Sequence, residues 1–291
     1  MKVFNRLRAW LGFTLGVLGT FVIALTTIVL GGFYRMVIDW WLPISNPFRH
    51  APRIWGVYIR YVVFGWIKGG RIEEHGDLPV LQKGGLIPLV ANHFTSEESP
   101  LFVWYIYSRL KMRTMVILKK EYRWKPMGFW TWAVGAAIFI DRGDPDASRA
   151  SIAREIAKAK KLGETLAIVS FPDGTRPTRE KIGPRSKRLR LRYLTDPKSG
   201  GTNKAVNDIS TDGMPVTVIK TAAFTIPRET TFPLGPSLRQ HISAMMHTHQ
   251  VYHIWSRTCK FRPNNLAETR DGLNYFWREI DDMITHLTDA G

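Results

Sequence analysis

The sequence contains a single cysteine, Cys259, and far fewer acidic than basic residues, with 24 Asp and Glu against 41 Lys and Arg. One cysteine excludes an intramolecular disulfide framework and a zinc site built from several cysteines, and it fits a chain folded in a reducing compartment. The sequence also lacks internal repeats, low-complexity tracts and a glycine-rich nucleotide fingerprint. What it does have is 45% hydrophobic residues, enough for a core, and a net charge of +17, which indicates an anionic partner such as nucleic acid, phospholipid, a phosphate-bearing substrate or an acidic carrier protein.

A long uncharged run occupies the N-terminal region. From Leu11 to Phe33 there are 23 residues without a charge, and about 20 suffice for a helix to cross the hydrocarbon core of a bilayer. A cleaved signal peptide is the alternative, but the run is long for that role and no clear small-x-small site ends it. The sequence therefore predicts a single-pass transmembrane anchor over residues 1–36. Basic residues flank the run on both sides, so the charge balance sets its orientation only weakly, and we expect the rest of the chain on the cytoplasmic face.

The next segment is rich in aromatic rings. Such rings beside a membrane span are typical of a segment in the lipid headgroup region, where a ring can be half dry and half wet. The alternative is an ordinary helix packed on the following domain. We expect an interfacial segment over residues 37–74. The aromatic residues between positions 34 and 70 are Tyr34, Trp40, Trp41, Phe48, Trp55, Tyr58, Tyr61, Phe64 and Trp66.

Residues 75–291 alternate between short β-rich runs and helical patterns. This alternation predicts an α/β domain with a largely parallel sheet flanked by helices. Helices are expected to open at Ser99-Pro100 and near Ser148, and a last helix is expected from Asn265 to Thr288. The expected strands are 86–91, 114–118, 136–140, 166–172 and 215–219.

One segment of this domain is strongly basic. Between Arg176 and Lys204 there are ten basic residues against two acidic ones, a net charge of +8. We interpret residues 177–212 as a basic insertion that holds the domain against anionic lipid or attracts a polyanionic substrate. Nucleic-acid binding is the rival interpretation, but base stacking needs interleaved aromatics and only Tyr193 is present, so no nucleic-acid partner is expected.

Polar residues follow four of the predicted strands. Because ligands of open α/β sheets bind beyond the carboxyl ends of the strands, these residues are candidates for one site. His93 is the natural general base, since an imidazole titrates near neutrality, and Glu98 could orient it where a loop turns into a helix. The alternative is that Glu97 and Glu98 only complement the helix dipole. The strand-end residues are Asn92-His93, Lys119-Lys120, Asp141-Arg142 and Asp173-Gly174-Thr175-Arg176.

Four further histidines and the lone cysteine lie near the C-terminus. His241, His247, His249 and His253 resemble a metal cluster at a glance, but no carboxylate or second cysteine accompanies them in a recognised spacing. We therefore expect no metal site. Cys259 has no nearby base in the sequence and is interpreted as a structural residue.

Several short blocks together resemble the glycerophospholipid acyltransferases, in particular the 1-acylglycerol-3-phosphate acyltransferase group. The resemblance covers about residues 75–225 and includes an N-terminal membrane segment. The blocks, which fall in the order and approximate spacing of that family, are Asn92–Glu98, Lys119–Pro126, Gly135–Arg142, Phe171–Arg176 and Gly213–Val216.

The resemblance implies a membrane-bound enzyme that moves a fatty acyl group from an acyl thioester to a lysophospholipid hydroxyl. His93 would take the hydroxyl proton and the carboxylate of Glu98 would orient the ring. No cofactor is implied, because the acyl donor, acyl-CoA or acyl carrier protein, is a cosubstrate. The implied partners are the membrane phospholipid, the lysophospholipid acceptor and that donor, and the implied substrate-binding residues are Lys120, Arg142, Asp173, Gly174, Thr175 and Arg176.

Two residues differ from the family pattern. The family usually has Asp at the position of Glu98 and Glu at that of Asp173, so one side chain is longer and the other shorter by a methylene. Both substitutions keep a carboxylate. Lipid A secondary acyltransferases carry Glu in the corresponding dyad, so another lysophospholipid or a lipid A-type acceptor remains the alternative to 1-acylglycerol-3-phosphate.

Overall fold

The structure, a computed structural model, describes residues 2–38, 46–77, 85–92, 98–141, 143–173, 187–210, 213–226 and 248–289. The α-helices are α1 (Lys2–Phe33), α3 (Ala51–Tyr58), α4 (Glu98–Ser108), α5 (Pro126–Ala133), α6 (Pro145–Lys161), α8 (Ser199–Ile209) and α10 (Leu266–Asp289). Two segments are π-helices, η1 (Tyr34–Ile38) and η3 (Ile59–Ile67), and two are 3-10 helices, η2 (Pro47–His50) and η4 (Lys120–Tyr122). The strands are β1 (Arg71–Gly76), β2 (Leu86–Ala91), β3 (Arg113–Lys119), β4 (Ala137–Ile140), β5 (Leu166–Ser170), β6 (Val216–Ile226) and β7 (Val251–Phe261).

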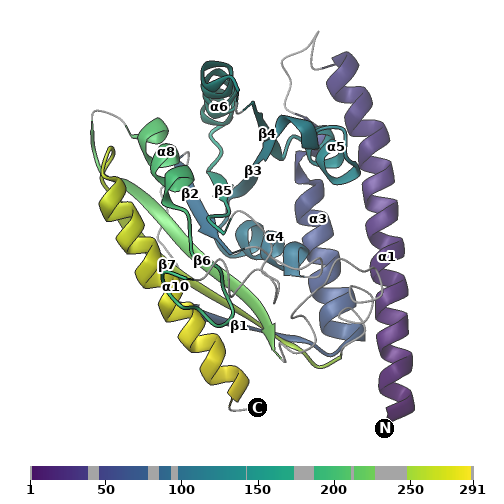
Figure 1. Cartoon of the computed structure of the whole chain (residues 1–291). Helices are drawn as coiled ribbons and strands as arrows, with labels where there is room; N and C mark the ends of the chain where they lie inside the picture. The colour runs from purple at the N-terminus through teal and green to yellow at the C-terminus, as the bar shows by residue number, and fades with distance from the viewer. Residues whose placement is uncertain are drawn as a thin grey trace.

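The strands form one mostly parallel sheet. Their order is β1-β7-β6-β2-β5-β3-β4, and among these neighbours only the β6–β7 pair is antiparallel. The strands β6, β2, β5, β3 and β4 therefore end at the same edge of the sheet (Figure 1). This arrangement confirms the predicted α/β fold with a largely parallel sheet.

Helices cover both faces of this sheet. Alternate residues of each central strand face opposite layers, as the period of two requires. In β5, Ala167 and Val169 join the cluster containing α3, α4 and η3, whereas Leu166 and Ile168 pack with Ile152 of α6. Beside α6, helices α8 and α10 cover β6 and β7 on that same face. Because both faces are covered, the central strands are nearly continuous apolar runs.

Helix α1 lies along the outer side of the helical layer formed by α3, η3 and α5 (Figure 1). The hydroxyl of Tyr58 donates to the carbonyl of Leu15 at 2.7 Å, and the indole N–H groups of Trp55 and Trp130 donate to α1 threonines at 3.0 and 2.8 Å. Gly19 lets the ring of Tyr58 approach, since a Cβ at that position would clash with the ring. One side of α1 is therefore packed on the domain.

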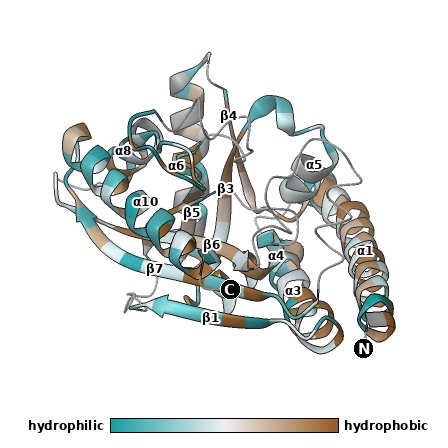
Figure 2. Ribbon diagram, turned by 60° about the horizontal axis from the view of Figure 1, so that its bottom comes forward, coloured by the Kyte–Doolittle hydropathy of each residue, from teal (hydrophilic) through white to brown (hydrophobic). Residues whose placement is uncertain are grey.

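The opposite side of α1 is apolar and exposed. Among the described residues, one helix is long and apolar enough to cross a membrane, spanning Val3–Ile38, with 6% of its most apolar window buried. Figure 2 shows apolar residues along most of this helix. The low burial distinguishes α1 from a core helix, and the exposed residues include Leu7, Leu11, Leu18, Val22, Leu25 and Val29.

The aromatic segment after α1 divides its rings between packing and exposure. Trp55 and Phe64 are buried, while Tyr61 and Trp66 are exposed. The packed-helix alternative thus describes part of this segment, and contact of Tyr61 and Trp66 with lipid stays a prediction. Residues 39–45 of the segment lie outside the described residues.

The described part of the basic segment, residues 187–210, folds onto α10. The carboxylate of Asp281 accepts the backbone N–H groups of Arg192, Tyr193 and Leu194 at 2.6–3.0 Å. Helix α8 follows within the segment and buries Val206 in the cluster under α10. These contacts tie the backbone to the domain, while Lys187, Arg190 and Lys198 remain exposed.

Candidate active site

Four neighbouring strands end beside one another at a single edge of the sheet. Asn92 follows β2, Asp173 lies just beyond β5, Lys120 follows β3 and Asp141 follows β4. In the sheet these strands are adjacent in that order. With about 4.8 Å between neighbouring strands, the four positions span roughly 14 Å. The structure thus brings together this described part of the predicted site.

Glu98 is held rigidly at the start of α4. Its side chain is buried, with 4% of the residue exposed, and its Oε1 accepts the backbone N–H of Thr225 at 2.9 Å and the Thr225 hydroxyl at 3.1 Å. The hydroxyl of Tyr252 donates to the Glu98 carbonyl at 3.2 Å. A carboxylate that only complemented the helix dipole would need none of these contacts. Glu98 is therefore fixed both through its side chain and through its backbone.

Asn92 extends the β2–β6 pairing by one step with its side chain. Its Nδ2 donates to the carbonyl of Ala223 at 2.9 Å, and its Oδ1 accepts the Ala223 N–H at 2.8 Å. The amide thus imitates a backbone peptide on the neighbouring strand. These two hydrogen bonds to β6 fix the end of β2 immediately before residue 93.

Asp173 is buried beyond the end of β5. One of its carboxylate oxygens accepts the indole N–H of Trp277, from α10, at 3.0 Å, and 2% of the residue is exposed. A buried carboxylate needs such donors because desolvation without hydrogen bonds is costly. Asp173 is therefore fixed against α10.

Lys120 pairs with the acid that follows the neighbouring strand. Its Nζ lies 3.3 Å from Asp141 Oδ2, and both groups are exposed. The N–H of Gly143, which donates to Asp141 at 2.9 Å, and the Lys120 ammonium lower the pKa of Asp141. Asp141 is thus ionised at neutral pH and partly neutralises Lys120.

A cavity of about 360 Å³ opens beside Lys120 and Asp141, against β4. The guanidiniums of Arg35 and Arg123 lie over the ring of Trp132, at 5.5 and 5.1 Å from its centroid. Together with Arg154, these groups give the cavity a surplus of positive charge over Asp141 and Asp144. Such a lining suits a phosphate-bearing ligand.

The remaining predicted site residues lie outside the described residues. These are His93, Arg142, Gly174, Thr175 and Arg176, together with Glu97, His241 and His247. Their roles therefore stay predictions.

Cys259 lies in β7, with its Sγ 3.7 Å from the carbonyl of Val218 on β6. Burial raises the pKa of its thiol, although the nearby ammonium of Lys220 opposes this. A thiol held protonated is a poor nucleophile, which agrees with its interpretation as a structural residue.

Sequence reasoning missed the residues that support the two carboxylates. Thr225 and Tyr252 lie in the parts of β6 and β7 that were not predicted as strands, and Trp277 lies in the last helix, which carried no candidate site residue. Arg35 and Arg154 line the cavity, but nothing in the sequence around them indicated a place in the site. Arg123 lies inside one of the quoted blocks, between Lys119 and Pro126, and could have been proposed there.

The class that this fold defines is an α/β protein with a candidate site at the carboxyl edge of a largely parallel sheet. The sequence pattern of the acyltransferase family matches residues 71–219, just over half of the chain, so the protein belongs to the acyltransferase family. Among solved structures, the 1-acyl-sn-glycerophosphate (LPA) acyltransferase PlsC from Thermotoga maritima is 15% identical, with a TM-score of 0.47, over 91% of this chain and 97% of that one. No curated protein sequence matches the chain significantly.

Proposed function

We propose that this acyltransferase-family protein moves a fatty acyl group from an acyl thioester to the free hydroxyl of 1-acylglycerol-3-phosphate, giving phosphatidic acid. The observation that carries the proposal is the buried carboxylate of Glu98, which accepts two hydrogen bonds from Thr225. It lies five residues after His93 in a chain of that family. A carboxylate fixed in this way can hold an imidazole in one tautomer and orientation.

In the proposed reaction His93 removes the proton from the acceptor hydroxyl as its oxygen attacks the thioester carbonyl carbon. The tetrahedral intermediate then collapses, the carbon–sulfur bond breaks, and the leaving thiolate takes the proton back from the imidazolium. The products are an ester and a free thiol, so atoms and charge balance. Glu98 stabilises the imidazolium that forms between these two proton transfers.

The basic groups along the sheet edge are assigned to phosphate binding. Arg142, Arg176 and Lys120 would bind the acceptor phosphate through charge-assisted hydrogen bonds, and Gly174 and Thr175 would let the backbone approach it. Asp173, held by Trp277, would support this loop from below. The donor, acyl-CoA or acyl carrier protein, supplies the thioester, and no cofactor is required.

The protein is proposed to act at a membrane, with α1 as its attachment. The exposed apolar side of α1 supports contact with lipid, since a continuous apolar surface of this length is unusual on a soluble monomer. A single pass and a cytoplasmic catalytic domain stay part of the proposal.

Acyl transfer from acyl-CoA to lysophosphatidic acid by the purified full-length protein tests the proposal. His93→Ala should abolish transfer, and Glu98→Gln should reduce it far more than Glu97→Gln, its matched neighbour. Undiminished transfer by His93→Ala would refute the mechanism, and equal losses at 97 and 98 would reassign the carboxylate.

A panel of lysolipids crossed with acyl-CoA and acyl carrier protein donors tests the choice of substrate by mass spectrometry. Turnover of lysophosphatidic acid above other lysophospholipids and lipid A-type acceptors is the expected result. A gel-shift series over increasing salt tests the rival class, and tight nucleic-acid binding without acyl transfer would favour that rival.

A further inference from the structure

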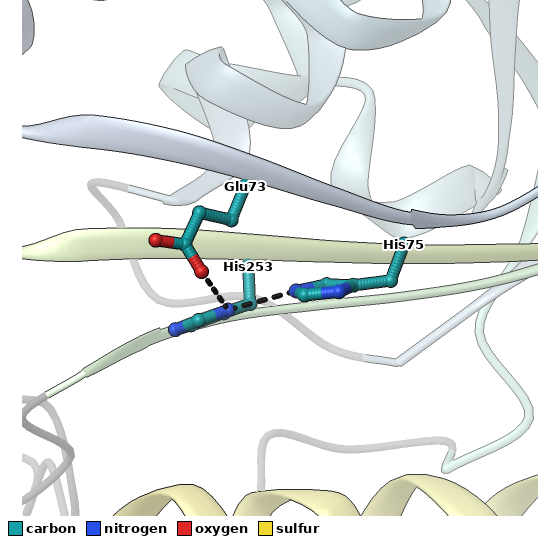
Figure 3. A group of neighbouring side chains, drawn as sticks. All are labelled: Glu73, His75 and His253. Carbon is teal, nitrogen blue, oxygen red and sulfur yellow. Dashed lines mark hydrogen bonds and ion pairs between the residues drawn. The ribbon is translucent and has the colours of Figure 1, made fainter.

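Three side chains with metal-binding atoms meet on one face of the sheet, at its β1 edge. Glu73 and His75 share a face of β1 because they are two residues apart, and the register pairs Glu73 directly with His253 of β7. Figure 3 shows the three side chains converging from the two strands. Their ligand atoms all lie within 4.8 Å of one another.

The imidazole rings are held in fixed orientations by stacking. His253 stacks on Phe224 with centroids 5.4 Å apart, and His75 stacks on Trp255 at 5.5 Å. The two imidazoles also stack on each other at 5.3 Å and 17°. Stacking of this kind lowers the entropy lost when the nitrogens bind a ligand, because the rings are already oriented.

One of the two distances to His253 Nδ1 fits a shared cation, and the other is 0.2 Å longer than the range expected for one. Atoms bound to one Zn²⁺ at about 2.0–2.1 Å lie about 2.8–3.4 Å apart when the bond angles are between 90° and 110°. Nε2 of His75 lies 3.0 Å from Nδ1 of His253, and Oε2 of Glu73 lies 3.6 Å from that Nδ1. The same nitrogen of His253 thus faces both other ligand atoms.

The surroundings also suit metal binding. Nε of Arg71 lies 3.1 Å from Oε1 of Glu73, which leaves Oε2 of that carboxylate facing His253. A neighbouring donor that orients a ligand carboxylate in this way is a regular part of protein metal sites.

We propose that Glu73, His75 and His253 bind one divalent transition-metal ion with the ligand preferences of Zn²⁺. Two imidazoles and a carboxylate form a recognised ligand set for this ion and leave a fourth position for water. The ion cross-links the edge strand β1 to β7. Its site lies on the α10 side of the sheet, whereas Tyr252, the residue before His253, contacts the backbone of Glu98 on the other side.

Metal titration of the purified full-length protein, stripped with a chelator, tests this site. Co²⁺ is titrated with visible absorption as the readout and displaced with Zn²⁺, and we expect one ion per chain. His75→Phe keeps a ring against Trp255 but removes the nitrogen, and Glu73→Gln keeps the shape but removes the charge. Each variant should weaken binding by roughly tenfold or more.

The control is His286→Phe on the exposed surface of α10, which should bind like the wild type. Zn²⁺ should also raise the Tm of the wild type and of the control, but not that of His75→Phe. The absence of saturable binding by the wild type overturns the site, as does wild-type affinity in both His75→Phe and Glu73→Gln. The result is independent of acyl transfer, so its failure is separable from failure of the proposed function.

Discussion

The two buried carboxylates at the candidate site, Glu98 and Asp173, are each held by a donor from a distant part of the chain. Glu98 accepts from Thr225 and Asp173 accepts from Trp277, residues separated from them by more than a hundred positions. The candidate carboxylates themselves could be predicted, because they follow predicted strands within recognisable blocks. Their supporting residues could not, since a threonine in a strand or a tryptophan in an amphipathic helix carries no local sign of its partner.

Replacing Thr225 tests the support of Glu98. Thr225→Val keeps the backbone N–H bond but removes the hydroxyl donor, so the carboxylate gains freedom to move. Displacements of about 1 Å can cost on the order of a hundredfold in rate, and because one bond remains we expect kcat for acyl transfer to fall roughly tenfold. Thr217→Val, the same change near the start of β6, should have little effect on kcat. Equal kcat values for the two variants would contradict the role of Thr225.

Replacing Trp277 tests the support of Asp173. Trp277→Phe removes a hydrogen bond to a buried carboxylate, which should lower the free energy of unfolding by about 1–3 kcal/mol beyond the loss of ring volume. Urea denaturation measures the change. The control is Trp104→Phe, because the Trp104 indole N–H has no hydrogen-bond partner in the described part of the chain. A loss no greater than that of the control would show that the Asp173 contact contributes little.

At the scale of elements, five predicted strands and the last helix were found where the sequence indicated them, because apolar runs bounded by turn residues are strong local signals. The two strands at the other edge were missed. β1 reads Arg-Ile-Glu-Glu-His-Gly, which is too polar for a buried strand, and β7 mixes charged and apolar residues. Both form because each pairs with a strand far along the chain. The same pairing places Glu73 and His75 beside His253, so the carboxylate missing from the C-terminal histidines comes from elsewhere in the sequence.

Charged substitutions on the exposed side of helix α1 test its contact with lipid. Leu18→Lys together with Val22→Lys places two charges on the exposed apolar side without touching the packed side. A charged residue within the apolar part of a membrane is costly, so the variant should move from the membrane fraction toward the soluble fraction on flotation. The control is Tyr275→Lys, an equally exposed position on α10. Unchanged membrane association of the double variant would show that this side of α1 does not contact lipid.

At the scale of the whole molecule, the net charge of +17 is concentrated rather than spread evenly. The segment from Arg176 to Lys204 carries +8 of it. The described part of that segment is fixed to α10 through backbone bonds to Asp281, which leaves cationic side chains facing solvent. A fixed basic surface can bind an anionic one with a smaller loss of chain entropy than a free loop.

Charge removal tests this surface. Lys187→Gln, Arg190→Gln and Lys198→Gln together should weaken binding to phosphatidylglycerol vesicles by tenfold or more at low salt, because each cation near an anionic surface contributes about 1 kcal/mol. The charge-matched control changes Arg262, Arg270 and Arg278, all exposed, to Gln. Vesicle co-sedimentation over a salt series measures binding. An equal loss of vesicle binding in both triple variants would show that binding depends on the total charge of the protein and not on this surface.

The pairing of β1 with β7 also bears on how the protein is made. His75 and His253 are 178 residues apart in the chain, yet they lie on adjacent strands. On a ribosome, β1 is synthesised long before β7, its neighbour among the described strands, and so is Glu98 before Thr225. Contacts of such separation are slow to form. The candidate active site is therefore completed only after β6 and α10 have been synthesised, long after Glu98 and Asp173 themselves.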